Sequence, residues 1–507
     1  MSHFIGFKWI AEHTGISPVQ AFSAESQIGT SRRTVINDGI CQETYPPGAR
    51  PDSTIPAHLT FVFKYETIHL EFLARLWGLI KPEILETWIR DEPADAYARR
   101  AGFFYEWMTK KRLSVPDISS GNYVDALDPA KYIVATRAEN VPRWRVRDNL
   151  PGTCEFCPVI VRSDAVRELE KYNCAKALTE LEAKFSADIL QRSASWLSIR
   201  ESRASFSIEQ DESQTERIRR FANVMELHCG QYNDPLSLQT LTELQTEILG
   251  TATRYGMRQS PATIGHVSND IHITDYIAPH WDQTQKLLTG LRATLDKTQQ
   301  SSSVVRAAIA SFGFVFIHPM TDGNGRISRF LINDILRRDG TVPAPYILPI
   351  SAAIANNSRE RAIYNQALER FSRPLMQKYS ECCHFGAETE YKDGVISKFH
   401  FDAYDEALPV WRYPNITTQT EYMGHVIRLT IESEMDKEAN FLRNMERARR
   451  AVKNYLEGPN TDIDKIIRSL RDNNWTLQSK LTETFPQLSN PKLAESIIQA
   501  VRGIFSS

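Results

Sequence analysis

The sequence predicts a mainly α-helical protein with small β elements. Long stretches of its middle third carry apolar residues at three- and four-residue spacing, which is the period of a helix with one buried face. Runs of β-favouring residues are few and lie beside turn formers. The 507 residues exceed what one hydrophobic core usually holds, so we expect several structural units.

Composition and charge exclude several classes of protein. The chain has 60 basic and 62 acidic residues, a net charge of −2, which gives no electrostatic basis for binding nucleic acid or an anionic membrane. No apolar run reaches transmembrane length, and the first residues lack the pattern of a secretory signal. Seven cysteines are sparse for this length and fit a reducing compartment. We therefore expect a cytoplasmic protein that contacts neither nucleic acid nor membrane.

The N-terminal region, residues 1–160, is mixed in character and has no assigned role. Residues 44–56 are rich in turn formers and predict a surface loop. The apolar stretch His58–Ile80 predicts one buried helix. It contains Glu66-x-x-His69, which resembles half of a di-iron site, but no second copy with matching carboxylates follows. We interpret this pair as the polar edge of a packed helix.

Two further patterns in this part of the chain are better explained by structure than by binding. Arginine alternates with tryptophan in Pro142–Gly152, which could hold a nucleic-acid strand, but the stretch is short and isolated. We expect a loop in which an arginine stacks on a tryptophan. Cys154 and Cys157 form a CxxC pair, whose only partners for a tetrahedral metal site would be the distant cluster at 382–384. We interpret them as structural thiols.

The middle region, residues 161–375, predicts a helical bundle interrupted by one hairpin. Periodicity resumes near Ala165. Further helices are predicted at 213–227, 236–249, 280–298 and 302–317. The interruption is Ser260–Pro279, where two β-favouring runs flank Ser268-Asn-Asp. In the last region, 376–507, we expect a hairpin around residues 391–395, helices from 417 to 457, and a small helical or winged-helix-like end.

Residues 318–329, HPMTDGNGRISR, combine several groups of different chemistry within one short stretch. An apolar helix precedes them and must end near Pro319, because proline disfavours the helical conformation of the residue before it. A second helix follows, with one apolar stripe and Gly340 at its C-terminal cap. The motif is therefore helix, tight loop, helix, with His318 at the first junction.

The residue types in this loop favour phosphate chemistry. The glycines of Asp322–Gly325 let backbone amides converge at a helix N-terminus, which makes an anion cradle. Arg326 and Arg329 lie on the same helical face, and two guanidinium groups suit a polyphosphate. Asp322 can hold a Mg²⁺ ion that bridges phosphates. His318 can act as a general base. The stretch predicts a phosphate-transfer site without a nucleophile of its own.

This stretch resembles the signature of the Fic family, H-P-F-x-(D/E)-G-N-G-R-x-x-R. The single departure is Met320 in place of phenylalanine, an apolar residue that can fill the same space. The resemblance implies a Fic-type helical bundle with a β-hairpin flap. It also implies an enzyme of the nucleotidyltransferase class, a protein adenylyltransferase that uses Mg²⁺ and moves AMP from ATP to a hydroxyl side chain of a target protein.

The resemblance also assigns roles to single residues. His318 would deprotonate the target Ser, Thr or Tyr, and Asp322 would bind Mg²⁺ against the α- and β-phosphates. Arg326 would hold the β-phosphate and Arg329 the γ-phosphate. Three residues would cradle the phosphates: Gly323, Asn324 and Gly325.

Two regulatory features of the family have counterparts upstream. The hairpin at about 260–279 would be the flap that aligns a target segment by strand addition, and it follows Arg254–Arg258. Its predicted contact residues are Thr263, Ile264, Gly265 and His266. An autoinhibitory helix at about 200–212 would match (S/T)-x-x-x-E-(G/N).

In that helix Ser205 and Glu209 lie one turn apart, and Glu209 would pair with Arg329 and displace the γ-phosphate. Gln210 departs from the pattern. Two nearby acids remain alternatives: Glu201 and Glu212.

Several questions stay open on the sequence alone. Tyr364 and Asn365 would approach the nucleotide base in the helix at 359–368, although a packing tyrosine fits equally well. The same motif also fits a de-AMPylase, a transferase of UMP or GMP, or a non-catalytic nucleotide sensor, with a decayed structural relic as a further alternative. Homodimer formation and modification of the chain by itself are compatible with the sequence.

Overall fold

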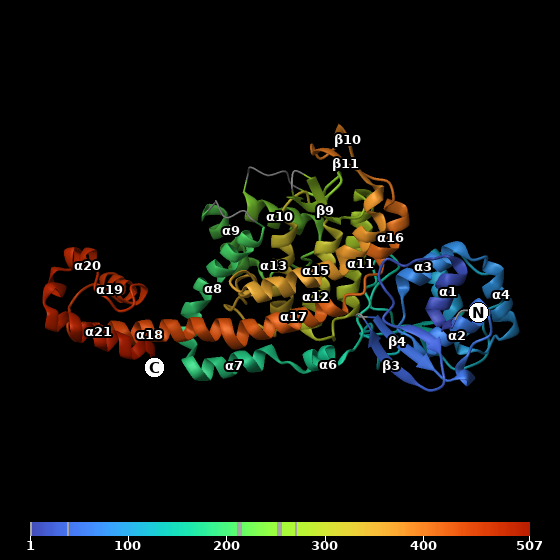
Figure 1. The fold of residues 1–507 in the computed structure, drawn as a ribbon, viewed down its shortest axis with the longest axis horizontal. Coiled ribbons are helices and arrows are strands. Elements are labelled where there is room, and N and C mark those ends of the chain that lie inside the picture. Colours follow the sequence, from blue (N-terminus) through green and yellow to red (C-terminus); the bar gives the residue numbers. More distant parts are fainter. Residues whose placement is uncertain (1–2, 38–39, 210–214, 251–255, 269–270, 507) are drawn as a thin grey trace.

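The chain forms three units arranged in sequence order along the longest axis of the molecule (Figure 1). The structure is a computed structural model that describes residues 3–37, 40–209, 215–250, 256–268 and 271–506. It is 60% helical, which confirms the predicted mainly α class. Among the described residues, no helix has the length and apolar character needed to cross a membrane.

The N-terminal unit combines a four-stranded sheet in the order β1-β2-β4-β3 with five helices. Its strands are β1 Phe4–Ile5, β2 Glu25–Ile28, β3 Arg33–Asn37 and β4 Ile40–Tyr45, and a smaller sheet follows with β5 Val124–Asp125, β6 Glu139–Val141 and β7 Val146–Asp148. The helices are α1 Gly6–Thr14, α2 Ile55–Tyr65, α3 Leu70–Leu79, α4 Pro82–Asp91 and α5 Ala96–Thr109. Their apolar faces form a core of this unit, in which Phe104 and Trp144 are fully buried.

The single helix predicted over His58–Ile80 is wrong, because α2 ends before Glu66 and α3 begins after His69. The side chain of Glu66 turns back to accept a hydrogen bond from the backbone N–H of Phe7 at 2.9 Å. His69 Nδ1 accepts from Phe72 N at 3.2 Å and so caps α3. Both residues serve the ends of helices.

The tryptophan–arginine loop has the structure expected for it. The guanidinium of Arg143 lies over the ring of Trp144, 4.8 Å from its centroid, and also pairs with Glu106 at 3.0 Å. Arg147 pairs with Asp125 across the small sheet at 2.6 Å. Both arginines therefore form ion pairs within the N-terminal unit. Nearby, Cys157 is a buried free thiol.

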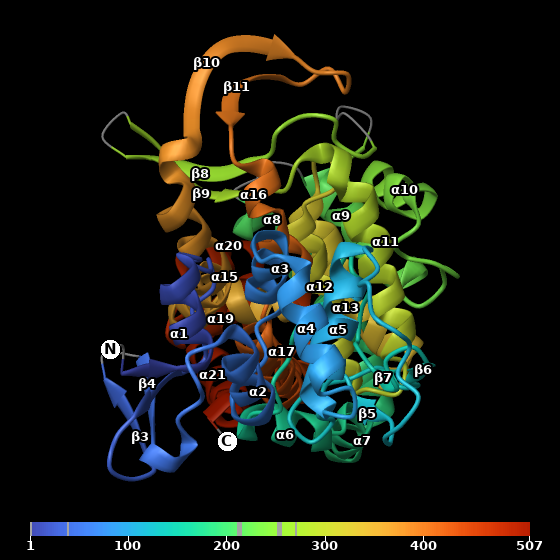
Figure 2. The same ribbon diagram turned by 90° about the vertical axis from the view of Figure 1, so that its right-hand side faces the viewer.

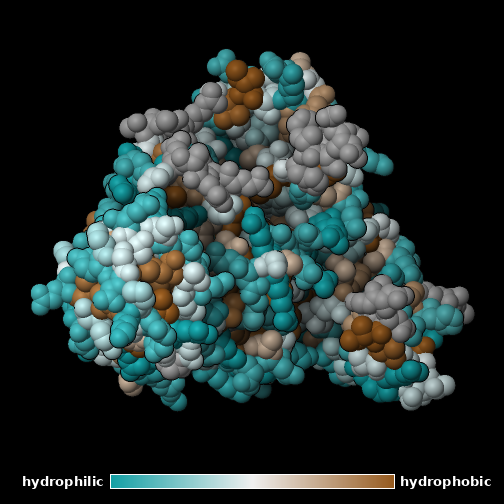
Figure 3. Space-filling view, turned by 60° about the vertical axis from the view of Figure 1, so that its left-hand side comes forward, coloured by the Kyte–Doolittle hydropathy of each residue, from teal (hydrophilic) through white to brown (hydrophobic). Residues whose placement is uncertain are grey.

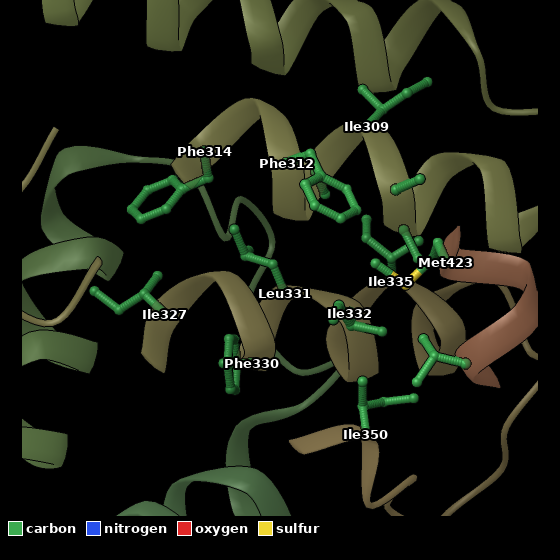
Figure 4. Close-up of a cluster of buried hydrophobic side chains, with 14 of the residues drawn as sticks. Ile309, Phe312, Phe314, Ile327, Phe330, Leu331, Ile332, Ile335, Ile350 and Met423 are labelled. Carbon is green, nitrogen blue, oxygen red and sulfur yellow. The ribbon is translucent and has the colours of Figure 1, made fainter. Parts of the chain in front are cut away.

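The central unit is a helical bundle built around α12, Ser303–Ile317, in which every residue except Val315 is buried. Its neighbours are α11 Trp281–Lys297, α13 Asn324–Arg338 and α17 Thr417–Leu429. Figure 4 shows Phe312 and Phe314 of α12 on the side of that helix that faces α13, which contributes Leu331, with Met423 of α17 at one end of the cluster. The apolar periodicity of the sequence thus becomes the core that carries the candidate site.

Further helices complete this bundle. They are α6 Asp164–Lys171, α7 Cys174–Phe185, α8 Ala187–Ile208, α9 Thr215–His228, α10 Leu238–Leu249, α14 Ile350–Ala355, α15 Ser358–Tyr379 and α16 Tyr404–Arg412. The helices predicted near 213–227, 236–249, 280–298 and 302–317 are confirmed as α9, α10, α11 and α12. Short 3₁₀ turns lie at Pro47–Ala49, Ser380–Cys382 and Pro486–Ser489.

Two β-hairpins stand at one end of the bundle (Figure 2). Strands β8 Thr263–Ser268 and β9 Ile271–Ile277 pair antiparallel, as do β10 Cys383–Glu390 and β11 Ile396–Phe401. The second hairpin folds back to the base of the first, because Asp393 in its turn accepts hydrogen bonds from Gln259 N at 2.6 Å and Ser260 Oγ at 2.7 Å.

The C-terminal unit stands at the end of a long helix. A π-helical turn, Thr430–Met435, joins α17 to α18, Asp436–Lys453, without a break in the rod. The unit itself is helical, with α19 Asn460–Asp472, α20 Ser479–Thr484 and α21 Pro491–Ser506 around a separate small core. On the face shown in Figure 3, hydrophilic residues dominate and hydrophobic residues gather in a few separate patches.

Candidate active site

The loop between α12 and α13 has the conformation that its residues favour. His318 ends α12 in the left-handed region, with φ 50°, and its N–H still bonds to Phe314 O at 2.9 Å. Gly323 precedes α13 with φ 82°, where a residue without Cβ meets no steric penalty. The chain therefore turns sharply between the two helices. Across this turn, the charges of Asp322 in the loop and of Glu209 act on the His318 imidazole.

Two amide side chains fix the loop. Asn324 Oδ1 accepts from Met320 N at 2.9 Å, and Asn324 Nδ2 donates to Met320 O at 2.8 Å. From α10, Gln245 Nε2 donates to Thr321 Oγ1 at 3.1 Å and to Asp322 O at 2.8 Å. Met320 is fully buried beneath the loop. The amide of Asn324 is thus engaged with the loop itself, which leaves the backbone N–H groups of α13 to face a ligand.

His318 is held as a neutral imidazole. Its Nδ1 lies 3.3 Å from Val315 O, which favours a proton on Nδ1 and leaves Nε2 as the basic nitrogen. Burial lowers the pKa of His318 to about 4, and the positive charge of Arg258 acts in the same direction. Val315 O, Glu209 and Asp322 act in the opposite direction. A neutral side chain at physiological pH is what a general base requires.

Arg329 joins α13 to the end of α8. Its Nε donates to Ser205 Oγ at 2.7 Å, and its Nη2 donates to Ser205 O at 3.2 Å and to Glu209 Oε1 at 2.6 Å. The Glu209 carboxylate also lies against Gly325, where an added Cβ would come within 2.0 Å of Oε1. Glu209 therefore occupies the N-terminal end of α13, where an anion would otherwise bind.

The structure distinguishes among the acids near this helix end. Burial alone would raise the pKa of Glu209, but the charge and hydrogen bond of Arg329 lower it below the usual value. Glu201 is buried at the N-terminus of α14, where it accepts from Ser351 N at 2.6 Å, and burial raises its pKa to about 7. Thus Glu209 binds Arg329 directly, and Glu201 caps another helix. Gln210 and Glu212 lie outside the described residues.

Asp322 and Arg326 form an ion pair one turn apart, with Asp322 Oδ1 3.0 Å from Arg326 Nη2. The guanidinium of Arg326 also lies 4.9 Å from the ring centroid of Phe206 on α8. Among the described residues, no group of three or more His, Cys, Asp or Glu side chains is placed to hold a metal. A single half-exposed carboxylate at a helix N-terminus suits Mg²⁺, which commonly takes its remaining ligands from phosphates and water.

The predicted residues on α15 differ in their positions. Burial raises the pKa of the Tyr364 hydroxyl, and the nearby charge of Arg329 opposes that shift. Its ring also packs against Tyr422, with centroids 5.8 Å apart. Asn365 is exposed on the same helix. Of the two predicted residues, Tyr364 therefore lies near Arg329, and Asn365 faces solvent.

The hairpin predicted to act as the flap is formed by β8 and β9, with a bulge between Ile264 and Gly265. Thr263, Ile264 and Gly265 are exposed, and the backbone of His266 pairs with Ile273. Of the segment predicted to precede the flap, residues 254 and 255 lie outside the described residues.

Two residues of the site, Gln245 and Arg258, were not identified as such from the sequence. Both act through backbone carbonyls that only the folded chain brings within reach. A lone glutamine in a helix, or an arginine before a hairpin, carries no signal of this in the sequence.

Comparison with known proteins identifies this region. Residues 235–336 match the model of the Fic/DOC family. The chain is 29% identical over 123 residues to protein adenylyltransferase fic-1 of Caenorhabditis elegans, covering 23% of this chain and 22% of the relative. It is 35% identical over 116 residues to protein adenylyltransferase Fic of Drosophila ananassae, covering 22% of each. The chain therefore spans about a fifth of the length of these relatives.

A solved structure of a Fic family protein from Desulfovibrio desulfuricans G20 matches with 17% identity and a TM-score of 0.39, over 59% of this chain and 82% of that one. Residues 235–336 of this chain therefore carry a Fic/DOC domain.

Proposed function

We propose that this protein is an adenylyltransferase that moves AMP from Mg-ATP to a Ser, Thr or Tyr hydroxyl of a target protein. The observation that carries the proposal is the placement of a neutral His318 beside a glycine-lined helix N-terminus with two arginines. The names of the matched relatives, which are protein adenylyltransferases, favour AMP over other groups.

The chemistry follows from these positions. Nε2 of His318 takes the proton of the target hydroxyl, and the oxygen attacks the α-phosphorus. The new P–O bond forms as the bond to the β-phosphate oxygen breaks, and pyrophosphate leaves. The N–H groups at the start of α13 and the guanidinium of Arg326 stabilise the negative charge that builds on the phosphates. A Mg²⁺ ion at Asp322 would neutralise part of that charge. His318 then returns its proton to solvent.

The protein as described is in an inhibited state under this proposal. Arg329 is 4% exposed and is already paired with Glu209, so a γ-phosphate must displace that carboxylate to reach it. ATP bound without this clamp would present its α-phosphate to His318 in the wrong orientation. Loss of the Glu209 carboxylate would allow productive binding.

The test uses ATP labelled at either the α- or the γ-phosphate, with Mg²⁺ and a cell lysate. The proteins compared are wild type, Glu209→Gly, and Glu209→Gly with His318→Ala, and Glu216→Ala is the control for loss of a surface acid near α8. We expect α-label on protein with Glu209→Gly, little with wild type or Glu216→Ala, and none when His318 is replaced.

Transfer of γ-label alone would show a kinase and overturn the proposal. If α-labelled UTP or GTP labelled protein and α-labelled ATP did not, the donor would be a different nucleotide. Release of AMP from modified protein, without its attachment, would instead show the reverse reaction.

A further inference from the structure

Arg258 is a buried arginine that lies between the flap and the end of α12. It is 2% exposed, and its guanidinium donates to backbone carbonyl groups. Nε donates to His318 O at 2.6 Å, Nη1 to Ser260 O at 3.0 Å, and Nη2 to Pro279 O at 2.6 Å. A longer contact of 3.4 Å joins Nη2 to Ile317 O.

These acceptors belong to two structural elements that must cooperate in the reaction. The carbonyls of Ile317 and His318 are at the C-terminus of α12, where a cation is favoured by the helix dipole. Ser260 and Pro279 precede and follow the β8–β9 hairpin. One side chain therefore ties both ends of the flap to the residue that carries the basic nitrogen.

The backbone reinforces this connection. The N–H of Arg258 donates to Pro319 O at 2.9 Å, and Met257 forms an isolated antiparallel β-bridge with Met320. The loop that follows His318 is thus paired with the segment that leads into the flap. The flap and the catalytic loop are bonded through both main chain and side chain.

Among the described residues, every hydrogen bond of this guanidinium goes to a backbone carbonyl. The nearby Asp393 carboxylate bonds to Gln259 N and Ser260 Oγ instead, so its charge offsets only part of the cost of burying the guanidinium. Burial lowers the pKa of Arg258 to about 10, which reflects that cost. Fixing a catalytic side chain is a function that offsets such a cost, since small displacements of a reacting group strongly lower the rate.

We propose that Arg258 is the positioning residue of the reaction, setting the orientation of His318 and fixing the flap relative to it through the same guanidinium. This inference rests on the proposed function for its kinetic consequence, but its structural part does not. The charge of Arg258 also acts on the His318 imidazole, together with Glu209 at the end of α8 and Asp322 in the loop.

A purely structural role is the alternative, and the chain offers a matched control for it. Arg99 in the N-terminal unit is also buried, at 3% exposed, and donates to carbonyl groups: Asp95 O at 3.2 Å, Asn122 O at 2.9 Å and Arg145 O at 3.3 Å. Replacing it removes the same kind of bonds from a place far along the chain from the site.

The experiment compares Arg258→Met, Arg258→Lys and Arg99→Met, each in the Glu209→Gly background. We measure kcat, KM for ATP and thermal unfolding. Separately, without nucleotide, we follow the titration of the His318 imidazole by NMR, identifying its signal by its absence from His318→Ala.

Arg258→Met is expected to lower kcat on the order of 10²-fold with KM for ATP changed less than about threefold. It should also raise the midpoint of the His318 titration, because a cation is removed. Arg258→Lys should restore the titration midpoint, because it keeps the charge, and only part of kcat, because it lacks the fork of donors. Arg99→Met should change thermal unfolding alone.

The inference would be overturned if Arg258→Met and Arg99→Met lowered thermal stability equally and neither changed kcat per folded molecule or the midpoint of the His318 titration. If Glu209→Gly shows no transfer at all, the proposed function fails, and the titration decides the inference by itself. A raised midpoint in Arg258→Met that Arg258→Lys reverses then supports it, and an unmoved midpoint overturns it.

Discussion

The carboxylate of Glu209, at the end of α8, lies 2.6 Å from the guanidinium of Arg329, in the first turns of α13. The two residues are far apart in sequence, and the pair closes the N-terminal end of α13 from within the same chain. Because Arg329 is buried, its charge depends on this partner and on Ser205 for compensation.

Loss of Glu209 should therefore weaken the protein and make its stability depend on ATP. We expect Glu209→Gly to lower the free energy of unfolding of the central unit by roughly 1–3 kcal/mol, because a buried guanidinium loses its counter-charge. Saturating Mg-ATP should restore that loss by placing phosphate at Arg329. Differential scanning calorimetry with and without nucleotide measures both effects. An ATP shift no larger than that of wild type would contradict this account.

The loop clamp of Asn324 predicts a strong effect on activity. Asn324→Ala removes both hydrogen bonds to Met320 and leaves two buried backbone groups without partners, at a cost of roughly 2–4 kcal/mol. In the Glu209→Gly background we expect kcat to fall on the order of 10²-fold. Asn324→Asp keeps the acceptor for Met320 N but loses the donor to Met320 O. Its kcat should lie between that of Asn324→Ala and that of the protein with Asn324 intact. Unchanged kcat in Asn324→Ala would show that the loop holds its shape without the clamp.

The helix that ends at Glu209, α8, also forms ion pairs with the long helix that leads to the C-terminal unit. Arg200 of α8 pairs with Glu438 at 2.7 Å and Glu434 at 3.4 Å on the rod that leads to the C-terminal unit. Partly exposed pairs contribute about 0.2–1 kcal/mol, so Arg200→Ala should raise basal transfer about two- to fivefold by loosening α8.

The same change in the Glu209→Gly background should leave transfer unchanged, because the carboxylate that we propose to be inhibitory is already gone. Arg373→Ala, which removes a surface arginine paired with Glu369 on α15, is the control. An equal gain with and without Glu209 would mean that Arg200 acts on some other step.

Glu201 should make stability depend on pH in a defined direction. Its pKa is raised to about 7 in the folded protein from an ordinary value of 4.5, so the folded state holds its proton more tightly than the unfolded state. The stabilisation from this proton is complete below pH 4.5 and is lost as the pH rises through about 7.

Glu201→Gln cannot lose that proton, so its stability relative to wild type should rise between pH 5 and pH 8 by roughly 1–3 kcal/mol. Denaturant unfolding at the two pH values measures this, with Glu216→Gln as the surface control. A difference that stays constant with pH would show that Glu201 keeps an ordinary pKa.

The parts of the fold set by local pattern could be predicted from the sequence. The apolar period of α12, the proline after His318 and the glycines before α13 are neighbours in the chain, and they were enough to predict the helix–loop–helix at the site. The break between α2 and α3 could not be predicted in this way, because Glu66 is drawn to Phe7, a residue far along the chain.

The choice between Glu201 and Glu209 shows the same limit within the site. The two acids are eight residues apart on one helix, which places them near the same face two turns apart. Which one meets Arg329 depends on where the N-terminus of α14 lies, since Ser351 and Ala352 take up Glu201. The motif predicted Glu209, the acid that pairs with Arg329, but only the packing of α14 explains why Glu201 does not.

The uneven distribution of indole rings affects how any unfolding experiment on this protein is interpreted. The N-terminal unit holds five of the nine tryptophans: Trp9, Trp77, Trp88, Trp107 and Trp144. Because each unit has its own apolar core, intrinsic fluorescence mainly reports on the N-terminal unit and less on the central unit that carries the candidate site. Of the four other tryptophans, Trp196 lies 52% exposed on the helix that ends at Glu209. A variant that keeps Trp196 and replaces the other indoles would turn release of that helix into a spectroscopic signal.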